Sequence, residues 1–410
     1  MKEREKMADL ALENVVVINF GWVLAAPVTG KYLADLGATV IRIESVHRPD
    51  PLRVSTPYKD NISGINRSCY YALYNANNYS MAINLKHPKG IDTAKRLVAK
   101  SDVVIENFTP GSMKRLGLGY EDLKEVKSDI IMLSLSMQGQ TGPYASHLGF
   151  GSQLTGLTGF THLTGWPDRP PVQPYAGVTD ACTPSLGAAA VIAALLHRRK
   201  TGKGQYLDLS QNEGSIQYLA PLMLDYFTSG TIANRSGNNC DHAAPHGAYP
   251  CKGNDLWCAI AVFTDQEWKD FCDVLDNPGW SNDPKFSTLL GRKKNEKELD
   301  RLISEWTIKY TPEEVMSKLQ AAKVPAGVVE KIGDLLVDPQ LKHRNHFWHL
   351  DHSEIGRYHH LGESFQLSET PVEGRMAAPI LGEHTEYICT QIMGMSDDEF
   401  TDLFTKGVFE

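Results

Sequence analysis

The chain lacks several features that would place it in other classes of protein. Its 410 residues contain no run of about 18 consecutive apolar residues, so the sequence predicts no membrane span. No basic tract stands out and the formal net charge is −8, which argues against nucleic acid as a partner. The first twenty residues hold no apolar stretch or A-x-A site of the kind found in secretory signals.

Cysteine is scarce and irregularly spaced. The seven cysteines are an odd number in a long chain and show no paired spacing. Disulfide frameworks need regular, even sets of cysteines, so the sequence favours a reduced, cytoplasmic protein.

Two groups of metal-binding side chains occur, but neither has the spacing of a metal site. The first group, within residues 240–251, has no C-x2-C pair of the kind that structural zinc sites favour. The second group, within residues 343–352, has a histidine at every third residue, so on a helix the four side chains would not share one face. We therefore expect no metal. The groups are Cys240, His242, His246 and Cys251, and His343, His346, His349 and His352.

Motifs for two common enzyme classes are also missing. The turn "NFGWVLAAP" has only Gly21 where a dinucleotide-binding fold needs three glycines, and Glu44 alone is a weak ribose signal. No G-x-S-x-G nucleophile elbow is present, because "GFGSQ" (149–153) lies in a turn-rich region. Cys182 has no nearby histidine in the sequence and is interpreted as an inert thiol.

Short apolar β-branched runs alternate with helical patterns through the first half of the chain. This alternation predicts right-handed βαβ units, a largely parallel sheet and an α/β fold. The expected strands are 14–20, 39–45, 80–85, 102–108, 129–139 and 204–210, and the expected helices are 27–38, 88–101, 113–128 and 184–199, with a further helix to about residue 226.

The remaining chain divides into loops and a smaller unit. Residues 149–179 are rich in Gly, Thr and Pro and are expected to form an ordered loop. Residues 228–247 are polar and turn-rich, which is typical of a domain boundary. After them, a hairpin around 252–255 and several helical patterns predict a small α+β unit.

One carboxylate, Asp180, stands beside the start of an alanine-rich helix. Thr183 and Pro184 have the residue types of a helix N-cap and first helical position, which puts Asp180 just before the helix. There the helix dipole favours an ionised carboxylate. Local sequence alone leaves two interpretations open, namely a structural capping role and a carboxylate nucleophile.

Several longer stretches resemble the family III CoA-transferases, the formyl-CoA transferase and carnitine CoA-transferase group, over nearly the whole chain. The resemblance places the family's catalytic aspartate on Asp180. It implies a Rossmann-like large domain built from both chain ends (1–227 and 331–410), a smaller domain between them (228–330) and an interlocked dimer. The matching stretches include "GATVIRIES", "DVVIENFTPGSMKRLGLGYEDL", "GPYASHLGF", "LHRRKTGKGQYLDLSQNEG" and "APILGEHTEYI".

The resemblance also implies a chemistry. Asp180 would attack an acyl-CoA thioester to form a mixed anhydride, and the CoA thiolate would return to form an aspartyl-CoA thioester. The acceptor acid would then attack this thioester, and the thiolate would move to the new acyl group. Acyl-CoA and a carboxylic acid are the implied substrates, with no metal or redox cofactor. Arg42, Asn107 and Arg115 match positions that line the family's CoA site.

The chain departs from the family pattern in ways that leave alternatives open. A basic pair expected before the third strand is replaced by Asn78 and Tyr79. Related α-methylacyl-CoA racemases carry a proton-transferring histidine where Phe150 stands, although His147 is close by. A non-catalytic subunit of a heteromeric transferase is a third interpretation. Two interpretations stay open for a further set of aromatic residues, namely the lining of a pocket for a bulky acid and packing in a core. The residues are Phe150, Phe160, Trp166, Tyr226 and Phe227.

Overall fold

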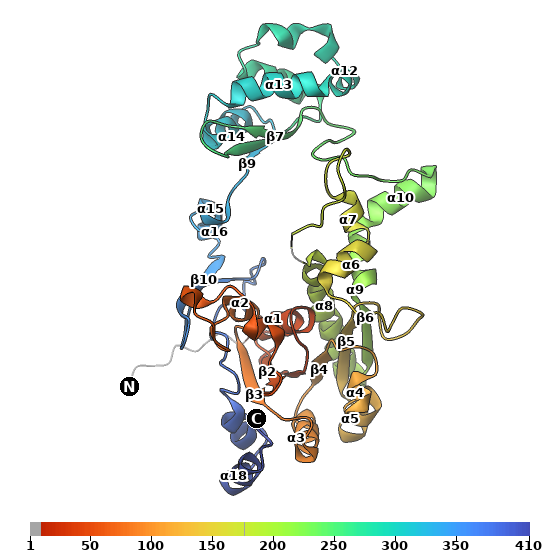
Figure 1. Ribbon diagram of the computed structural model, residues 1–410, viewed down its shortest axis with the longest axis vertical. Coiled ribbons are helices and arrows are strands. Elements are labelled where there is room, and N and C mark those ends of the chain that lie inside the picture. The colour runs from red at the N-terminus through yellow and green to blue at the C-terminus, as the bar shows by residue number, and fades with distance from the viewer. Residues whose placement is uncertain (1–9, 176) are drawn as a thin grey trace. The chain divides into compact units, whose positions relative to one another are not determined.

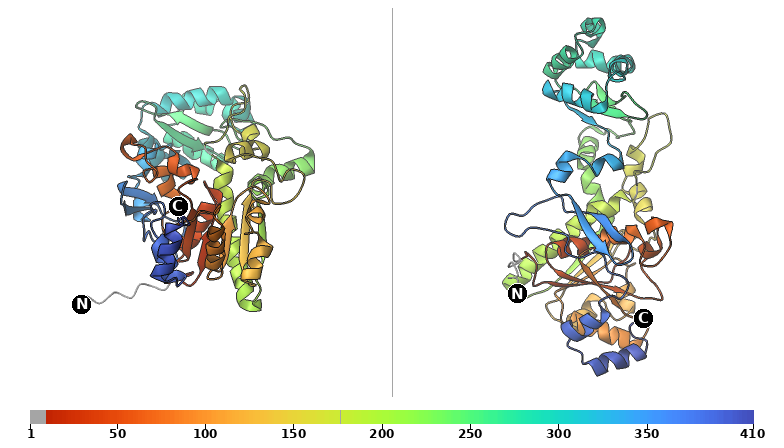
Figure 2. Two further views of the ribbon diagram at one scale, coloured as in Figure 1. Left: turned by 60° about the horizontal axis from the view of Figure 1, so that its bottom comes forward. Right: turned by 90° about the vertical axis from the view of Figure 1, so that its left-hand side faces the viewer.

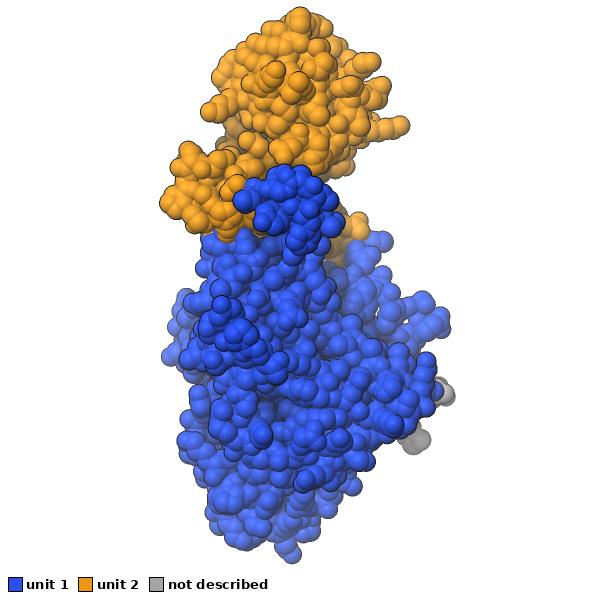
Figure 3. Space-filling model, turned by 90° about the vertical axis from the view of Figure 1, so that its right-hand side faces the viewer, with its two compact units in different colours: residues 1–161, 173–232, 343–410 blue, residues 162–172, 233–342 orange. Residues whose placement is uncertain are grey.

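The computed structural model describes residues 10–175 and 177–410. Residues 1–9, on which the expectation of no secretory signal partly rests, lie outside the described residues. The chain divides into two compact units, coloured separately in Figure 3. The large unit contains 10–161, 173–175, 177–232 and 343–410, and the small unit contains 162–172 and 233–342. Compared with the expected segments, the small unit also includes 162–172 and extends to 342.

The large unit is built on a six-stranded parallel sheet with the order β3-β2-β1-β4-β5-β6 (Figure 1). The predicted α/β fold is confirmed. The order reverses between β1 and β4, which makes the carboxyl ends of these two strands the usual ligand-binding position in such a sheet. The strands are Val16–Asn19 (β1), Thr39–Glu44 (β2), Asn78–Ala82 (β3), Val103–Glu106 (β4), Ile131–Ser136 (β5) and Tyr206–Ser210 (β6).

Helices cover both faces of this sheet because successive strand residues point to opposite sides. Val17 faces a core made with α1 and α8, whereas its neighbour Ile18 faces a core made with α3, α5 and the C-terminal segment. The covering helices are Ala25–Asp35 (α1), Val178–Thr201 (α8), Pro88–Val98 (α3), Tyr120–Val126 (α5) and Asp397–Thr405 (α18).

The C-terminal segment completes the large unit without adding a strand to its main sheet. Ile388, Leu403 and Phe409 pack in the same core as Ile18 and Met81, and the left view of Figure 2 shows the blue C-terminal helices beside the first strands. The predicted return of the chain to the large domain is therefore observed. Phe347–His352 (β10) and Gly356–Leu361 (β11) form a separate hairpin, and Thr385–Tyr387 (α17) leads into a short π-helix, Ile388–Ile392.

The small unit contains a three-stranded antiparallel sheet and a helical layer. His246–Pro250 (β7) and Trp257–Ala261 (β8) form the predicted hairpin, and Ala326–Val328 (β9) pairs with β8. Its core contains Phe271, Ile303 and Leu319. The helices that supply most of this core are Asp265–Val274 (α11), Glu296–Thr307 (α13) and Pro312–Ala321 (α14).

The predicted helix 113–128 and the predicted loop 149–179 are among the elements that differ from those observed. The expected helix 113–128 is split into Ser112–Arg115 (α4) and α5, because Gly117 has a φ of 69°, which α-helices do not allow. The expected loop 149–179 contains two short helices, Gly151–Leu157 (α6) and Phe160–Leu163 (α7), and residue 176 of that loop lies outside the described residues.

Helix α8 is the only described helix that is long and apolar enough to cross a bilayer, judged by length and composition. Core helices of folded domains meet the same criterion. In this chain α8 buries Val191 and Ala194 against the sheet and α1. The prediction of no membrane span rests on the absence of a long uninterrupted apolar run. Helix α8 contains scattered small polar residues, so it has no such run, although its mean hydropathy is high.

Candidate active site

Asp180 lies in the first turn of α8 rather than ahead of the helix. The helix begins after Gly177, whose carbonyl accepts a hydrogen bond from the Asp180 N–H at 2.8 Å. The prediction that the helix starts at Pro184 is wrong. Pro184 is inside the helix, where its missing N–H leaves the carbonyl of Asp180 without the usual helical partner. The first turn still places the carboxylate at the positive end of the helix dipole.

The two oxygens of the Asp180 carboxylate have different surroundings. Oδ1 accepts a hydrogen bond from Nε2 of Gln211 at 2.8 Å. Oδ2 lies against the backbone of two glycines. A Cβ atom added to Gly151 would lie 2.3 Å from Oδ2, and one added to Gly177 would lie 2.8 Å from it. Only glycine at these positions allows the chain to approach the carboxylate so closely.

Burial raises the pKa of Asp180 above its ordinary value, and the hydrogen bond from Gln211 opposes that rise. A carboxylate with a raised pKa is poorly solvated and more basic, and both properties make it a better nucleophile. Asp180 remains partly exposed, so a small molecule can reach it.

Two tyrosines lie within electrostatic reach of this carboxylate. The negative charge of Asp180 contributes to the raised pKa of Tyr70 and of Tyr74, both from Cys69–Tyr74 (α2), although burial is the larger cause for each. Tyr175, which is 99% exposed, interacts electrostatically with the same two tyrosines. The phenol groups of Tyr70 and Tyr74 are therefore close enough to Asp180 to be influenced by its charge.

The carboxyl ends of β1 and β4 form a braced loop near the reversal of strand order. The side-chain amide of Asn107 makes two hydrogen bonds to the backbone of Trp22. Its Oδ1 accepts from the Trp22 N–H, and its Nδ2 donates to the Trp22 carbonyl, each at 2.8 Å. The Trp22 ring packs edge-on against Phe108. Asn107 is thus at the expected ligand-binding edge, where it holds the first βα loop in shape.

Arg42 is placed differently from the expectation that it contacts CoA. Its side chain has no exposed surface, and its guanidinium pairs with Asp50 at 2.8 Å and donates to Asn75 at 3.0 Å. Asp50 in turn accepts from the N–H of Val23, in the same βα loop that Asn107 braces. In this structure Arg42 therefore supports the loop from inside, because burial with a carboxylate partner leaves no face open to a phosphate.

Arg115 remains free to meet an anion. It is exposed at the end of α4, and its guanidinium donates to the hydroxyl of Ser112 at 2.8 Å. Nearby, burial raises the pKa of Glu106, the last residue of β4, to about 7, against hydrogen bonds from Ser134 and the Phe108 N–H. Glu106 is consequently not fully charged near neutral pH, which reduces repulsion of a phosphate at this edge.

The aromatic residues proposed to line an acid pocket are placed in different ways. Phe150 is 69% exposed and precedes Gly151, which lies against Asp180, whereas Phe227 is 71% exposed and Trp166 belongs to the small unit. The two positions of the family's basic pair hold uncharged residues that are part of the packed structure. Asn78 is buried in β3, and Tyr79 packs against His384 and Tyr387.

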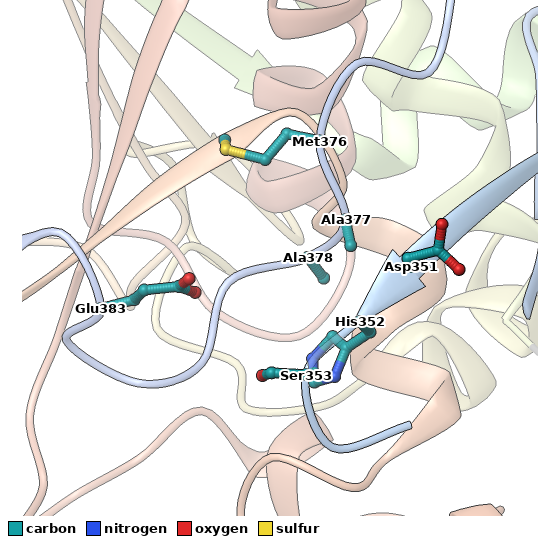
Figure 4. Close-up of a pocket in the computed structure, with 7 residues that line it drawn as sticks. All are labelled: Asp351, His352, Ser353, Met376, Ala377, Ala378 and Glu383. Atoms are coloured by element: carbon teal, nitrogen blue, oxygen red, sulfur yellow. The ribbon is translucent and has the colours of Figure 1, made fainter. Parts of the chain in front are cut away.

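A separate hollow lies in the large unit, between the end of β10 and the segment before α17 (Figure 4). Its volume is about 350 Å³, and Asp180 does not line it. The residues that line the hollow are Asp351, His352, Ser353, Met376, Ala377, Ala378 and Glu383.

Among the residues that the structure describes, no three His, Cys, Asp or Glu side chains are arranged to hold a metal ion.

Gln211, Gly151 and Gly177 were missed from the sequence. Gln211 is part of the stretch "GQYLDLSQNEG", but nothing in its local pattern shows that it meets Asp180, 31 residues earlier. The glycines stand among many others in a turn-rich region, and their role depends on an approach between α6 and α8.

Comparison with known proteins gives a consistent result. The sequence model of a family described as CoA-transferase family III matches residues 12–385. A succinyl-CoA–D-citramalate CoA-transferase from Chloroflexus aurantiacus is 32% identical over 397 residues, 97% of this chain and 98% of that protein. A succinyl-CoA–L-malate CoA-transferase beta subunit from the same organism is 31% identical over 405 residues, 97% of this chain and 98% of that protein. The crystal structure of a CAIB/BAIF family protein from Brucella suis has a TM-score of 0.86 and 29% identity, covering 94% of this chain and all of that one.

Proposed function

The chain belongs to CoA-transferase family III, and from this premise we propose that it transfers CoA from an acyl-CoA to a free carboxylic acid through covalent intermediates on Asp180. The observation that carries the proposal is a partly exposed carboxylate with a raised pKa, held on one oxygen and facing bare glycine backbone on the other. Two relatives are named for succinyl-CoA and for hydroxy-dicarboxylic acids, so succinyl-CoA is the first donor to test.

Each step conserves atoms and charge. An Asp180 oxygen attacks the thioester carbon, the C–S bond breaks, and CoA leaves as a thiolate. The thiolate attacks Cγ of Asp180, and the donor acid leaves as a carboxylate that carries the bridging oxygen. The acceptor carboxylate then attacks Cγ of the aspartyl-CoA thioester and releases the thiolate, which finally attacks the new acyl carbon and frees Asp180.

The proposal is tested by following oxygen. With an acceptor acid labelled with oxygen-18 in its carboxylate, Asp180 should gain one labelled oxygen in a turnover, because the bridging oxygen of the second anhydride comes from the acceptor and stays on Asp180. Mass spectrometry of the Asp180 peptide measures this. Product formation with an unlabelled Asp180 would contradict the covalent route. Solvent deuterium at the α-carbon of a 2-methylacyl-CoA, without label on Asp180, would support a racemase.

The raised pKa of Asp180 predicts the pH dependence of the reaction. Only the ionised carboxylate attacks, so kcat/KM should fall as the pH is lowered through the raised pKa of Asp180 in the free enzyme. The acid limb of the profile should lie above the ordinary value for an aspartate. A profile that stays flat down to that ordinary value would contradict the assignment.

Arg115 is the proposed phosphate contact of CoA. Arg115→Ala should raise the KM for the acyl-CoA about tenfold with little change in kcat, because a phosphate contact is made equally in the ground and transition states. Steady-state kinetics measure the split. Lys124→Ala removes an exposed cation from the neighbouring helix α5 and serves as the control. Equal effects of the two substitutions would show that Arg115 has no specific role.

The proposed assembly is a dimer, formed by two copies or with a related chain. Helix α10 (Ala220–Ser229) has no buried residue, and Leu224 and Phe227 are 61% and 71% exposed. An apolar helix without a buried residue is typical of an interface with another chain. Sedimentation equilibrium of the purified protein tests this, since a monomer at micromolar concentration would contradict it.

A further inference from the structure

Gln211 is fixed in place by its surroundings. It begins the helix Gln211–Ile216 (α9), directly after β6, and the hydroxyl of Ser210 caps that helix by accepting from the Glu213 N–H at 3.3 Å. Helix α9 packs closely on α8, since a Cβ added to Gly214 would lie 2.8 Å from Cγ2 of Thr183. Gln211 is only 8% exposed. Burial therefore restricts rotation of its side chain and favours the position of its amide beside Asp180.

The hydrogen-bond partners distinguish the two oxygens of Asp180. Gln211 Nε2 donates to Oδ1, and no hydrogen bond from the described residues reaches Oδ2. An oxygen that accepts a hydrogen bond has a lone pair committed to its donor. Oδ2 keeps its lone pairs and faces Gly151 and Gly177, which present no side chain.

We infer that Oδ2 is the atom that attacks the thioester and that Gln211 is an oxyanion donor to Oδ1 in the later steps. The inference rests on the proposed function. When Oδ2 forms the bond to the acyl carbon, Oδ1 becomes the carbonyl oxygen of the aspartyl half of the anhydride. When the CoA thiolate then attacks Cγ, the electron pair of that carbonyl moves onto Oδ1. Gln211 already donates to this atom, at a distance suited to an oxyanion.

The same donor acts again in the second half of the reaction. The acceptor carboxylate attacks Cγ of the aspartyl-CoA thioester, and negative charge again develops on Oδ1 before the C–S bond breaks. In the other two steps, attack on an acyl carbon puts the negative charge on the carbonyl oxygen of the substrate. Gln211 donates to Oδ1 of Asp180 and not to that oxygen. Gln211 should therefore accelerate the two steps at Cγ and contribute little to the two steps at acyl carbon.

This difference between steps gives the test. Gln211→Leu, similar in size but without a donor, should lower kcat about 100-fold, the order found for loss of one oxyanion donor, with the dissociation constant for the acyl-CoA unchanged. During single turnovers quenched on the millisecond scale, mass spectrometry should find acyl adducts accumulating on Asp180 in the variant. CoA adducts should be correspondingly depleted relative to wild type.

A second readout separates this role from a structural one. Gln211 lowers the pKa of Asp180, so the acid limb of the kcat/KM profile should move to higher pH in Gln211→Leu. Gln211→Ala should behave alike, which covers the case in which the leucine does not fit. The control is Asn212→Leu, which removes the neighbouring amide, whose partner is Gln138 rather than Asp180. It should leave both the rate and the adduct ratio unchanged.

The outcomes distinguish failure of the inference from failure of the proposed function. If Asp180→Asn is inactive but folded Gln211 variants keep wild-type kcat and adduct ratios, the inference is wrong and the nucleophile assignment stands. If Gln211→Leu slows both kinds of step equally, Gln211 only supports the fold. If Asp180→Asn itself transfers CoA normally, the covalent route through Asp180 in the proposed function fails, and the inference about Gln211 fails with it.

Discussion

Asp180→Asn should lower CoA transfer by about 1,000-fold or more while leaving the fold intact. The amide is almost the same size as the carboxylate, but its oxygen is a weak nucleophile and cannot form the mixed anhydride. Its nitrogen would also face either Gln211 or the two glycines, so the geometry of attack is lost with the charge. Initial rates with succinyl-CoA and an acceptor acid measure the effect. Hydroxylamine converts activated acyl groups into hydroxamates, so it should trap an adduct at Asp180 in the wild type and none in Asp180→Asn.

A matched control is Asp270→Asn in the small unit. Asp270 also accepts a hydrogen bond from a glutamine amide, since Nε2 of Gln266 donates to its Oδ1 at 2.9 Å in a solvent-exposed interaction on helix α11. That substitution should leave the rate unchanged. Activity of Asp180→Asn within tenfold of wild type would remove Asp180 from the mechanism.

The second large effect is expected at Gly151. An added Cβ would lie 2.3 Å from Oδ2 of Asp180, far inside van der Waals contact, and also 3.0 Å from the Cα of Gly177. Either the carboxylate or α6 must shift, and a displacement of about 1 Å at a reacting atom costs about 100-fold in rate. Gly151→Ala should therefore lower kcat about 100-fold, measured under saturating acyl-CoA.

Gly156→Ala is the control within the same helix α6. A Cβ at Gly156 meets no atom within 4 Å. Alanine at a helix position without a clash is preferred over glycine, so this variant should keep full activity and gain up to about 1 kcal/mol in the free energy of unfolding. If Gly151→Ala were as active as Gly156→Ala, the close approach of α6 to Asp180 would not matter for catalysis.

Much of the large unit could be predicted from residues that are neighbours in the chain. Apolar β-branched runs and helical patterns are local, and their alternation was sufficient to predict a parallel α/β sheet and all six of its strands. The hairpin of the small unit followed from a turn between two such runs. The family motifs also pointed to Asp180, and the family assignment is confirmed over residues 12–385.

Contacts between distant segments could not be obtained in this way. Arg42 has the residue type of a phosphate ligand, yet folding buries it against Asp50, because β2 lies inside the sheet and its side chains have no path to solvent. Helix α8 starts six residues before Pro184, because packing against α6 and α1 stabilises a first turn that local capping rules did not identify.

Asp180 illustrates what neighbouring residues in the sequence can and cannot predict about the site. The prediction that it is the reactive carboxylate follows from motifs along the chain. The assignment of different partners to its two oxygens does not, because Gln211 begins α9 and Gly151 begins α6, and only the packing of these two helices against α8 brings them together. A hydrogen bond of 2.8 Å requires atoms to meet in space, and no periodicity in a sequence records which distant residues do so.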